Sequence, residues 1–143
     1  MTTMPMFPLG TVLFPTMYLP LHVFEPRYRE MTRACLAGDR ELGVVLIERG
    51  SEVGGDDVRT SVGTVARIVE ATELPDGRWA LGTVGVRRIR VTEWLPDDPY
   101  PQADVEDWPD PPHDGVIESA YAEALATLRR VLEIGRASCR ERV

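Results

Sequence analysis

The sequence predicts an α+β fold that is mainly β, with a barrel-like sheet, one helix near its start and a second helix after it. Between residues 41 and 107, apolar residues form short runs or alternate with polar ones, and Gly and Pro separate these segments, as strands require. Only two segments, near residues 26–38 and 114–132, show the apolar spacing of a helix. The length of 143 residues suits one principal domain with a sizeable core.

The N-terminal segment is predicted to form short strands and turns, because proline recurs every few positions and excludes a helix. Residues Met4–Leu9 are mostly apolar, and a second short apolar run, Val12–Phe14, ends at Pro15. Residues Tyr18–Val23 alternate around Pro20. Since proline cannot donate to a sheet ladder, this segment is predicted to be an edge strand or an irregular one.

The first helix is predicted to begin at Pro26, because proline suits the first helical position. Glu25 precedes it, where a negative charge meets the positive end of the helix dipole. Gly38 is expected to end the helix as a left-handed cap. The apolar residues that define its buried face are Tyr28, Met31, Cys35 and Leu36.

Three strands are predicted in the middle of the chain. Residues Glu41–Glu48 form an apolar run typical of a buried strand, and Val58–Leu74 and Arg78–Trp94 flank a Pro-Asp-Gly turn typical of a hairpin. Gly63 is expected to mark a bulge or bend. A long twisted hairpin of this kind is typical of closed or half-closed barrels.

The C-terminal part combines an extended connector with a helix. Residues Leu95–Pro112 are rich in proline, and a short strand is predicted within them at Gln102–Asp107. Asp114 is a candidate N-cap for a helix whose apolar stripe extends to Leu132. That stripe needs a packing partner.

Charge and composition exclude several classes of function. The formal net charge of −7 argues against a protein that binds a phosphate backbone. The 16 basic residues are all arginine, so a P-loop lysine, a Schiff-base lysine and a Ser–Lys dyad are excluded. No apolar run is long enough to span a membrane, no signal peptide is evident, and two cysteines without a CxxC spacing indicate a cytoplasmic protein.

The residues that could carry chemistry show no catalytic or metal-binding pattern. The serines lie in no nucleophile motif, and only His22 and His113 could serve as bases. Cys35 lies on the predicted buried face of its helix, where an inert thiol is expected rather than a partner for His22. Two histidines and one or two cysteines do not supply a metal site. We therefore predict no catalytic residues, no metal and no cofactor.

One basic cluster, Arg87, Arg88 and Arg90, allows two interpretations. It could bind nucleic acid along one strand face. However, no aromatic residues alternate with these arginines to stack on bases, and the net charge is unfavourable. A solvated face paired with acidic neighbours is the interpretation we favour.

Two long blocks, Met6–Pro15 and Leu19–Tyr28, are followed at suitable spacing by Gly43–Ile47 and Val62–Ala66. Together they resemble the N-terminal, substrate-binding domain of the Lon protease family, which cereblon shares. The resemblance covers about Met4 to Leu132. It implies a PUA-like pseudobarrel of about six strands with one helix, followed by a helical bundle of which this chain holds the first helix.

The residues that carry the resemblance are expected to maintain the fold. Phe7, Phe14 and Phe24 are expected to fill the barrel core. Glu25 and Arg27 are expected to hydrogen-bond locally, with Tyr28 packed on the barrel. The remaining motif positions set the backbone or belong to the motif: Pro8, Gly10, Pro15, Pro26, Gly43 and Gly63.

We therefore expect residues 1–112 to form the pseudobarrel and residues 113–132 to begin the bundle. Residues 133–143 resemble the translation of a sequencing adapter in one reading frame, so we expect them not to be native and the natural chain to continue past Leu132. The alternative is a basic helical tail.

The resemblance implies a non-catalytic module that binds unfolded or extended segments of other proteins, either on its own or as the front end of a full ATP-dependent Lon protease. RNA binding is a weaker alternative that the PUA-like architecture suggests. The helix Val116–Leu132 is expected to support self-association, since its stripe has no partner in the chain. No membrane partner is expected.

Overall fold

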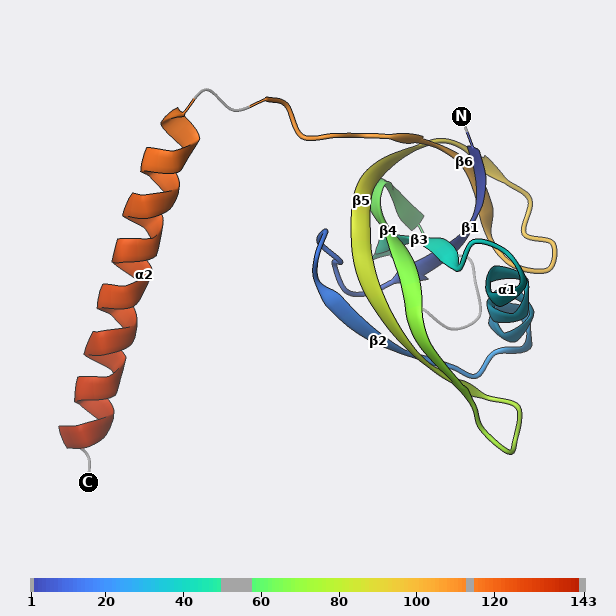
Figure 1. Ribbon diagram of the computed structural model, residues 1–143, viewed down its shortest axis with the longest axis horizontal. Helices are drawn as coiled ribbons and strands as arrows, with labels where there is room; N and C mark the ends of the chain where they lie inside the picture. Colours follow the sequence, from blue (N-terminus) through green and yellow to red (C-terminus); the bar gives the residue numbers. More distant parts are fainter. Residues whose placement is uncertain (1, 50–57, 113–114, 142–143) are drawn as a thin grey trace. The chain divides into compact units, whose positions relative to one another are not determined.

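The computed structural model describes residues 2–49, 58–112 and 115–141 (Figure 1). Along the chain, the elements are β1 (Thr2–Leu9), β2 (Tyr18–Val23), α1 (Pro26–Ala37), β3 (Glu41–Arg49), β4 (Val58–Glu73), β5 (Trp79–Leu95), β6 (Gln102–Asp107) and α2 (Val116–Glu141). By its contacts the chain divides into two units, Met1–Pro109 and Asp110–Val143. The first unit holds all the strands, and α2 belongs to the second.

The six strands form one sheet in the order β2-β5-β4-β3-β1-β6. An additional pairing between β5 and β6 closes this sheet on itself, so that the strands wrap around a common core (Figure 1). The pairing of β1 with β3 is parallel and the other pairings are antiparallel. This is the predicted mainly β pseudobarrel of six strands.

The strand β5 makes closure of the barrel possible because it is long enough to pair with three neighbouring strands. Its first part, Trp79–Val84, pairs with β2, and its last part, from Ile89 to Leu95, pairs with β6. Strand β4 lies along β5 on its other side, with two interruptions of register. Among the described residues, β2 pairs with β5 alone, which confirms the predicted edge strand.

The barrel core contains two clusters of buried apolar side chains. One packs α1 against the sheet and includes Phe7, Tyr28, Met31 and Leu42, while the other fills the interior nearer β6 and includes Met6. The buried residues of α1 include Tyr28, Met31 and Cys35. The spacing of three and four in the sequence therefore identified the buried face of this helix correctly.

The predicted helix cap is wrong in one respect. Helix α1 begins at Pro26 as expected, but Gly38 has φ −111° and is not left-handed. The left-handed residue is Arg40, with φ 63°. The amides of both Gly38 and Arg40 donate to the Cys35 carbonyl, at 3.1 and 2.9 Å, so the turn is completed two residues after the glycine.

The other predicted strands agree with the structure, and the hairpin turn at Gly77 has the expected positive φ of 88°. The apolar run Val12–Phe14 forms no strand. At Gly63, the register between β3 and β4 shifts just beyond its pairing with Val45, in agreement with the expected irregularity. The candidate N-cap Asp114 lies outside the described residues.

Helix α2 is the only element of its unit among the described residues, and its described side chains are almost all exposed. It extends through positions 133–141. Whether residues 133–143 are native stays a prediction. Neither described helix is long and apolar enough to cross a membrane, and the cytoplasmic location stays a prediction as well.

A nearly buried carboxylate joins β3 to the two long strands. Glu41 accepts hydrogen bonds from Arg67 of β4 at 2.8 Å and from Arg87 of β5 at 3.0 Å. Burial alone would raise the pKa of Glu41 above its ordinary value of 4.5, but the two guanidinium groups outweigh burial and hold the pKa below that value. The carboxylate therefore stabilises the folded barrel in its charged form.

Glu41→Gln is expected to lower the free energy of unfolding by about 1–2 kcal/mol at pH 7, because the amide loses the charge that attracts the two arginines. The cost is limited because the amide keeps some hydrogen bonds and because solvent partly screens the exposed arginines. Since the folded pKa of Glu41 is depressed, its contribution is complete above the unfolded pKa and is lost as the pH falls through the folded value. Urea unfolding at pH 7 and pH 3 should show this difference shrinking at the lower pH. A constant difference would mean that the charge of Glu41 contributes nothing.

Candidate functional site

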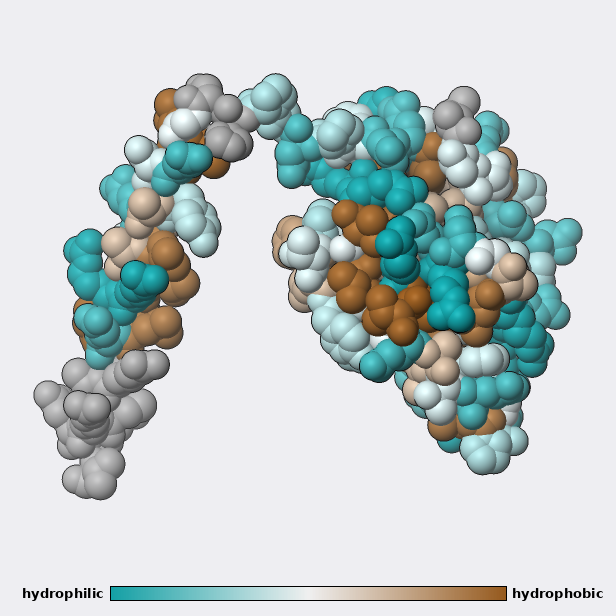
Figure 2. Space-filling view, viewed as in Figure 1, coloured by the Kyte–Doolittle hydropathy of each residue, from teal (hydrophilic) through white to brown (hydrophobic). Residues whose placement is uncertain are grey.

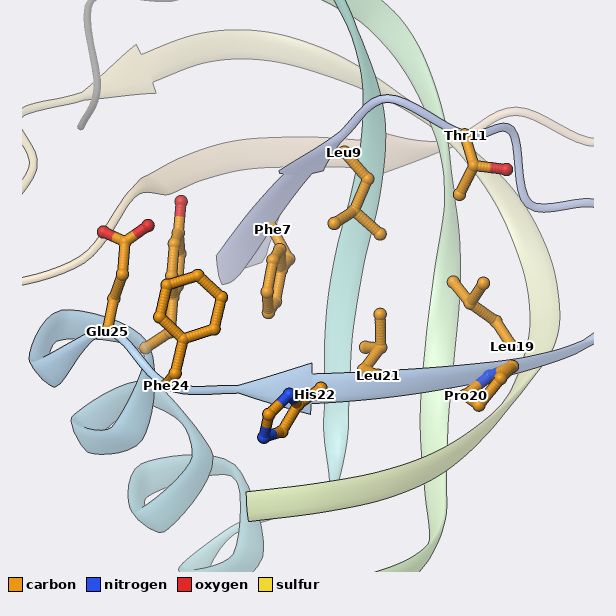
Figure 3. Close-up of a pocket in the computed structure, with 10 residues that line it drawn as sticks. Phe7, Leu9, Thr11, Leu19, Pro20, Leu21, His22, Phe24 and Glu25 are labelled. Atoms are coloured by element: carbon orange, nitrogen blue, oxygen red, sulfur yellow. The ribbon is translucent and has the colours of Figure 1, made fainter. Parts of the chain in front are cut away.

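Among the motif residues named in the sequence analysis, Phe7, Phe24, Glu25 and Tyr28 meet where β1, β2 and the start of α1 come together. They line a pocket of about 340 Å³ on the barrel surface (Figure 3). The other residues that line it are Leu9, Thr11, Leu19, Pro20, Leu21 and His22. In Figure 3, Leu19 and Leu21 point from β2 toward β1, whereas Pro20 and His22 point to the other side of the strand.

The inner wall of this pocket is a buried, stacked pair of aromatic rings. Phe7 and Tyr28 stack with their ring centroids 4.3 Å apart and their planes 6° apart, and both side chains are buried. The Arg27 guanidinium lies 4.6 Å from the centroid of the Tyr28 ring. Arg27 Nε also donates to Glu25 Oε2 at 3.0 Å, which confirms the expected local hydrogen bond. The motif residues thus fix the corner between β2 and α1.

Two of the three phenylalanines expected in the core are instead on the surface. Phe7 is 6% exposed, but Phe14 is 64% and Phe24 is 45% exposed. Side chains of β2 alternate, so Leu21 and Val23 face the core while His22 and Phe24 face outward. In the loop before β2, Leu13 takes the buried position and leaves Phe14 outside. The prediction that Phe14 and Phe24 fill the core is therefore wrong.

The loop that carries Phe14 is tied down by backbone contacts. The Thr16 amide donates to the Gly85 carbonyl at 2.8 Å, and the Gly85 amide donates to the Met17 carbonyl at 2.9 Å. Thr64 Oγ1 donates to the Leu13 carbonyl at 2.6 Å. Phe14 is therefore presented to solvent from a loop held against β4 and β5.

Exposed apolar side chains stand at both ends of β2. Met17 and Tyr18, which are 43% and 53% exposed, lie with Phe14 at its start, and Phe24 follows its end. We call these four residues, Phe14, Met17, Tyr18 and Phe24, the apolar rim. A hollow of about 420 Å³ flanks β2 on its other side, lined in part by Tyr18, Pro20 and Glu70. Strand β2 thus runs between two depressions and carries apolar groups at each end.

Sequence reasoning missed Met17, Tyr18, Leu19 and His22 as parts of this surface. The alternation around Pro20 held the necessary signal. An edge strand with Leu21 and Val23 inside must present Tyr18, Pro20 and His22 on its other face. Because the motif residues are interpreted as structural, this outward face is not predicted.

The remaining motif residues lie apart from the pocket. Gly43 and Gly63 sit within β3 and β4, where a side chain at Gly43 would meet Met6 and one at Gly63 would meet the Val44 carbonyl. Pro8 is buried in β1. The others lie on the surface: Gly10, Pro15 and Pro26.

The arginine cluster is engaged with acidic and carbonyl groups, as expected of a paired surface. Arg87 contacts Glu41 and Asp107, each at 3.0 Å, and Arg90 forms an ion pair with Glu106. Arg88 Nε donates to the Trp108 carbonyl at 3.1 Å. No local sequence signal predicted the role of Trp108, whose ring centroid lies 4.3 Å from the Arg90 guanidinium carbon.

The described residues contain no group of three or more His, Cys, Asp and Glu side chains that could hold a metal ion. Cys35 is buried, and its Sγ donates to the Glu41 carbonyl at 3.5 Å. Burial, with a smaller effect from Asp39, raises the pKa of the Cys35 thiol to about 12. A thiol with so high a pKa is a poor nucleophile.

Comparison with known proteins gives consistent results. Residues 3–140 match the family model of the ATP-dependent protease La (LON) substrate-binding domain. The chain is 32% identical over 138 residues to Lon protease 2 of Herpetosiphon aurantiacus, which covers 93% of the chain and 17% of that protein. It is 35% identical over 107 residues to the Lon protease of Cytophaga hutchinsonii, covering 73% of the chain and 13% of the relative.

Solved structures with a similar fold are also N-terminal domains of Lon proteins. The crystal structure of a Lon N-terminal domain protein from Xanthomonas campestris aligns with a TM-score of 0.66 and 33% identity, covering 80% of this chain and 64% of that one. The N-terminal domain of Mycobacterium avium complex Lon protease aligns with a TM-score of 0.67 at 20% identity, covering 93% of this chain and 72% of that one, and supports the fold. The chain thus spans less than a fifth of the length of the curated relatives described above.

Proposed function

Because the chain belongs to the ATP-dependent protease La (Lon) substrate-binding domain family, we propose that it binds extended or unfolded segments of other proteins and performs no catalysis itself. The observation that carries this proposal is the surface around β2. An edge strand, a pocket of about 340 Å³ and the apolar rim occur together there.

The edge of β2 offers backbone groups to an incoming strand. Among the described residues β2 pairs with β5 on one side only, so its other edge can add an extended segment. Pro20 supplies no amide hydrogen, so pairing at that position is limited to its carbonyl. Apolar side chains of the segment would enter the pocket beside Phe24, while its backbone follows β2.

The apolar rim supports sequence-tolerant binding. Its members contact a partner through apolar surface, which does not demand a particular hydrogen-bonding pattern. The titratable residues that line the pocket are His22, Glu25 and Tyr28. Glu25 is already hydrogen-bonded to Arg27, and the Tyr28 ring is already stacked on Phe7. We therefore propose a preference for unfolded segments rich in apolar and aromatic residues over acidic ones.

A second possibility is that the chain is the front end of a full ATP-dependent Lon protease. The Lon relatives favour it, because this chain covers only 17% of the Herpetosiphon protein. Finding a Walker lysine and a Ser–Lys dyad encoded downstream in the same gene would establish that the chain is the front end of a full protease. RNA binding has less support, because the arginine cluster is paired with Glu41, Asp107 and Glu106.

Phe24→Ala and Phe14→Ala are each expected to weaken polypeptide binding about tenfold, because each removes an exposed aromatic anchor. The measurement is fluorescence anisotropy with a labelled polypeptide that has been reduced and alkylated so that it cannot fold. The melting temperature should change little, since Phe14 is 64% and Phe24 45% exposed. Val62→Ala serves as the control, because Val62 is also exposed, at 43%, but lies on β4 outside the apolar rim.

Two results would contradict the proposal. Unchanged affinity in both phenylalanine variants would exclude the surface around β2. An equal loss in the Val62→Ala control would show that the probe adheres to any exposed apolar residue.

A further inference from the structure

The hollow on the outer side of β2 has a floor of small residues. Two rungs of the sheet cross this hollow, each with one residue from β2, β5 and β4: Pro20, Gly82 and Glu70 in one rung, and His22, Ala80 and Thr72 in the next. On β5, Leu81 between the two rungs is 3% exposed and faces the core, so Gly82 and Ala80 face the hollow. The middle strand therefore contributes almost no side chain, and a depression of about 420 Å³ remains between β2 and β4.

Two polar groups converge over Gly82 from opposite sides. A Cβ atom there would lie 2.6 Å from Tyr18 Oη and 3.3 Å from Glu70 Oε2. The phenol of β2 and the carboxylate of β4 thus reach over the same glycine. In the part of the chain that the structure describes, Glu70 forms no ion pair, and no arginine lines the hollow. The carboxylate therefore faces the hollow without a cationic partner among these residues.

This combination favours a cationic side chain. A guanidinium or ammonium group is attracted by the face of a tyrosine ring and forms a charge-assisted hydrogen bond with a carboxylate. Glu70 would repel an acidic side chain, and a purely apolar one would cover the carboxylate without pairing it. The methylene stem of arginine or lysine also packs on apolar surface, which Pro20 supplies. Figure 2 shows a similar mixture on the visible face of the barrel, where brown apolar residues adjoin teal polar ones.

The free edge of β2 brings such a side chain within reach. A segment added to that edge would lie one strand spacing from β2, and Gly82 lies one spacing beyond β2 on the other side, about 10 Å in all. An extended arginine or lysine side chain that crosses Pro20 covers most of this distance, and its hydrogen bond to Glu70 completes it. Alternate residues of the same segment would face the apolar pocket beside Phe24, because successive side chains of a strand point to opposite faces.

We propose that the hollow over Gly82 binds the side chain of an arginine or lysine in the segment that adds to β2. Glu70 is the counter-ion, and the Tyr18 ring lies beside the cation. The preferred segment therefore has apolar residues on one face and at least one basic residue on the other. This inference rests on the proposed binding of extended segments at β2, and Glu70 determines its specificity.

Three labelled peptides test this specificity by fluorescence anisotropy with the full chain. They share a host sequence in which leucine and serine alternate, and they differ only at one central serine position, which holds arginine, glutamine or glutamate. The arginine peptide should bind about fivefold more tightly than the glutamine peptide, and the glutamate peptide should bind most weakly. Glu70→Gln should remove the difference between the arginine and glutamine peptides. Glu70→Arg should reverse the order, so that the glutamate peptide binds more tightly than the arginine peptide.

Glu73→Gln is the matched control. It removes the same charge from the same strand, and Glu73 is also exposed but does not line the hollow. The arginine preference should persist in this variant. If Glu73→Gln weakens the preference as much as Glu70→Gln does, the net charge of −7 attracts basic peptides from a distance, and the proposed site is wrong. Tryptophan fluorescence reports that each variant stays folded, since the three tryptophans lie in the first unit.

The outcomes separate this inference from the function on which it rests. Equal binding of all three peptides, lost in Phe24→Ala, would overturn the role of Glu70 and leave segment binding at β2 in place. Binding that is unaffected by Phe24→Ala and Phe14→Ala, or no binding of any peptide, would overturn both.

Discussion

Phe7→Ala is expected to lower the free energy of unfolding of the barrel by about 3–5 kcal/mol, the usual cost of emptying a buried phenylalanine site. Phe7 is 6% exposed and belongs to the cluster that packs α1 on the sheet. Its ring also stacks on Tyr28 with 4.3 Å between centroids, and the substitution removes that contact. The cavity would lie where β1, β2 and α1 meet, so these elements would lose their common support.

The measurement is urea unfolding followed by tryptophan fluorescence, which reports on the first unit because all three tryptophans lie there. Phe24→Ala is the matched control, since it deletes the same side chain at a position just after the end of β2. Its expected cost is below about 1 kcal/mol, because Phe24 is 45% exposed. Equal losses in the two variants would contradict the assignment of Phe7 to the core and Phe24 to the surface.

The contrast between these two phenylalanines shows how far the sequence determined the fold. Local patterns identified the strands and the buried face of α1, because alternation and helical spacing follow from backbone geometry alone. The resemblance supplied the closed barrel. Neither source separated Phe7 from Phe24, since an aromatic residue in a motif serves the core and the surface equally well. The alternation of inward and outward side chains along β2 places Phe24 outside, but only once Val23 is known to point inward.

The candidate site was less predictable than the fold, because it is built from residues that the core does not use. The apolar rim depends on a loop held by hydrogen bonds to Gly85, which is about 70 positions away in the sequence. The position of Arg90 over the Trp108 ring likewise depends on the pairing of β5 with β6. Contacts of this range follow from topology and have no local signature.

The second large effect is expected at Gly63, where the sheet leaves no room for a side chain. A Cβ atom there would lie 2.3 Å from the Val44 carbonyl oxygen and 2.7 Å from Val45 Cγ1. A carbonyl oxygen within a strand cannot move without disturbing the ladder, and the branched Val45 side chain is restricted in rotation. The register of β3 against β4 shifts next to this position, so the close approach belongs to the sheet geometry.

Gly63→Ala is therefore expected to lower the free energy of unfolding by about 3 kcal/mol, at the upper end of overpacking costs. Gly43→Ala is the matched control. A Cβ atom at Gly43 would lie 2.5 Å from Met6 Sδ and 2.7 Å from Met6 Cε, at the end of a flexible side chain that can turn aside. Its expected cost is about 1 kcal/mol. The same fluorescence-detected urea titration compares the two variants, and a Gly43→Ala cost as large as that of Gly63→Ala would show that crowding against the backbone is not what distinguishes these glycines.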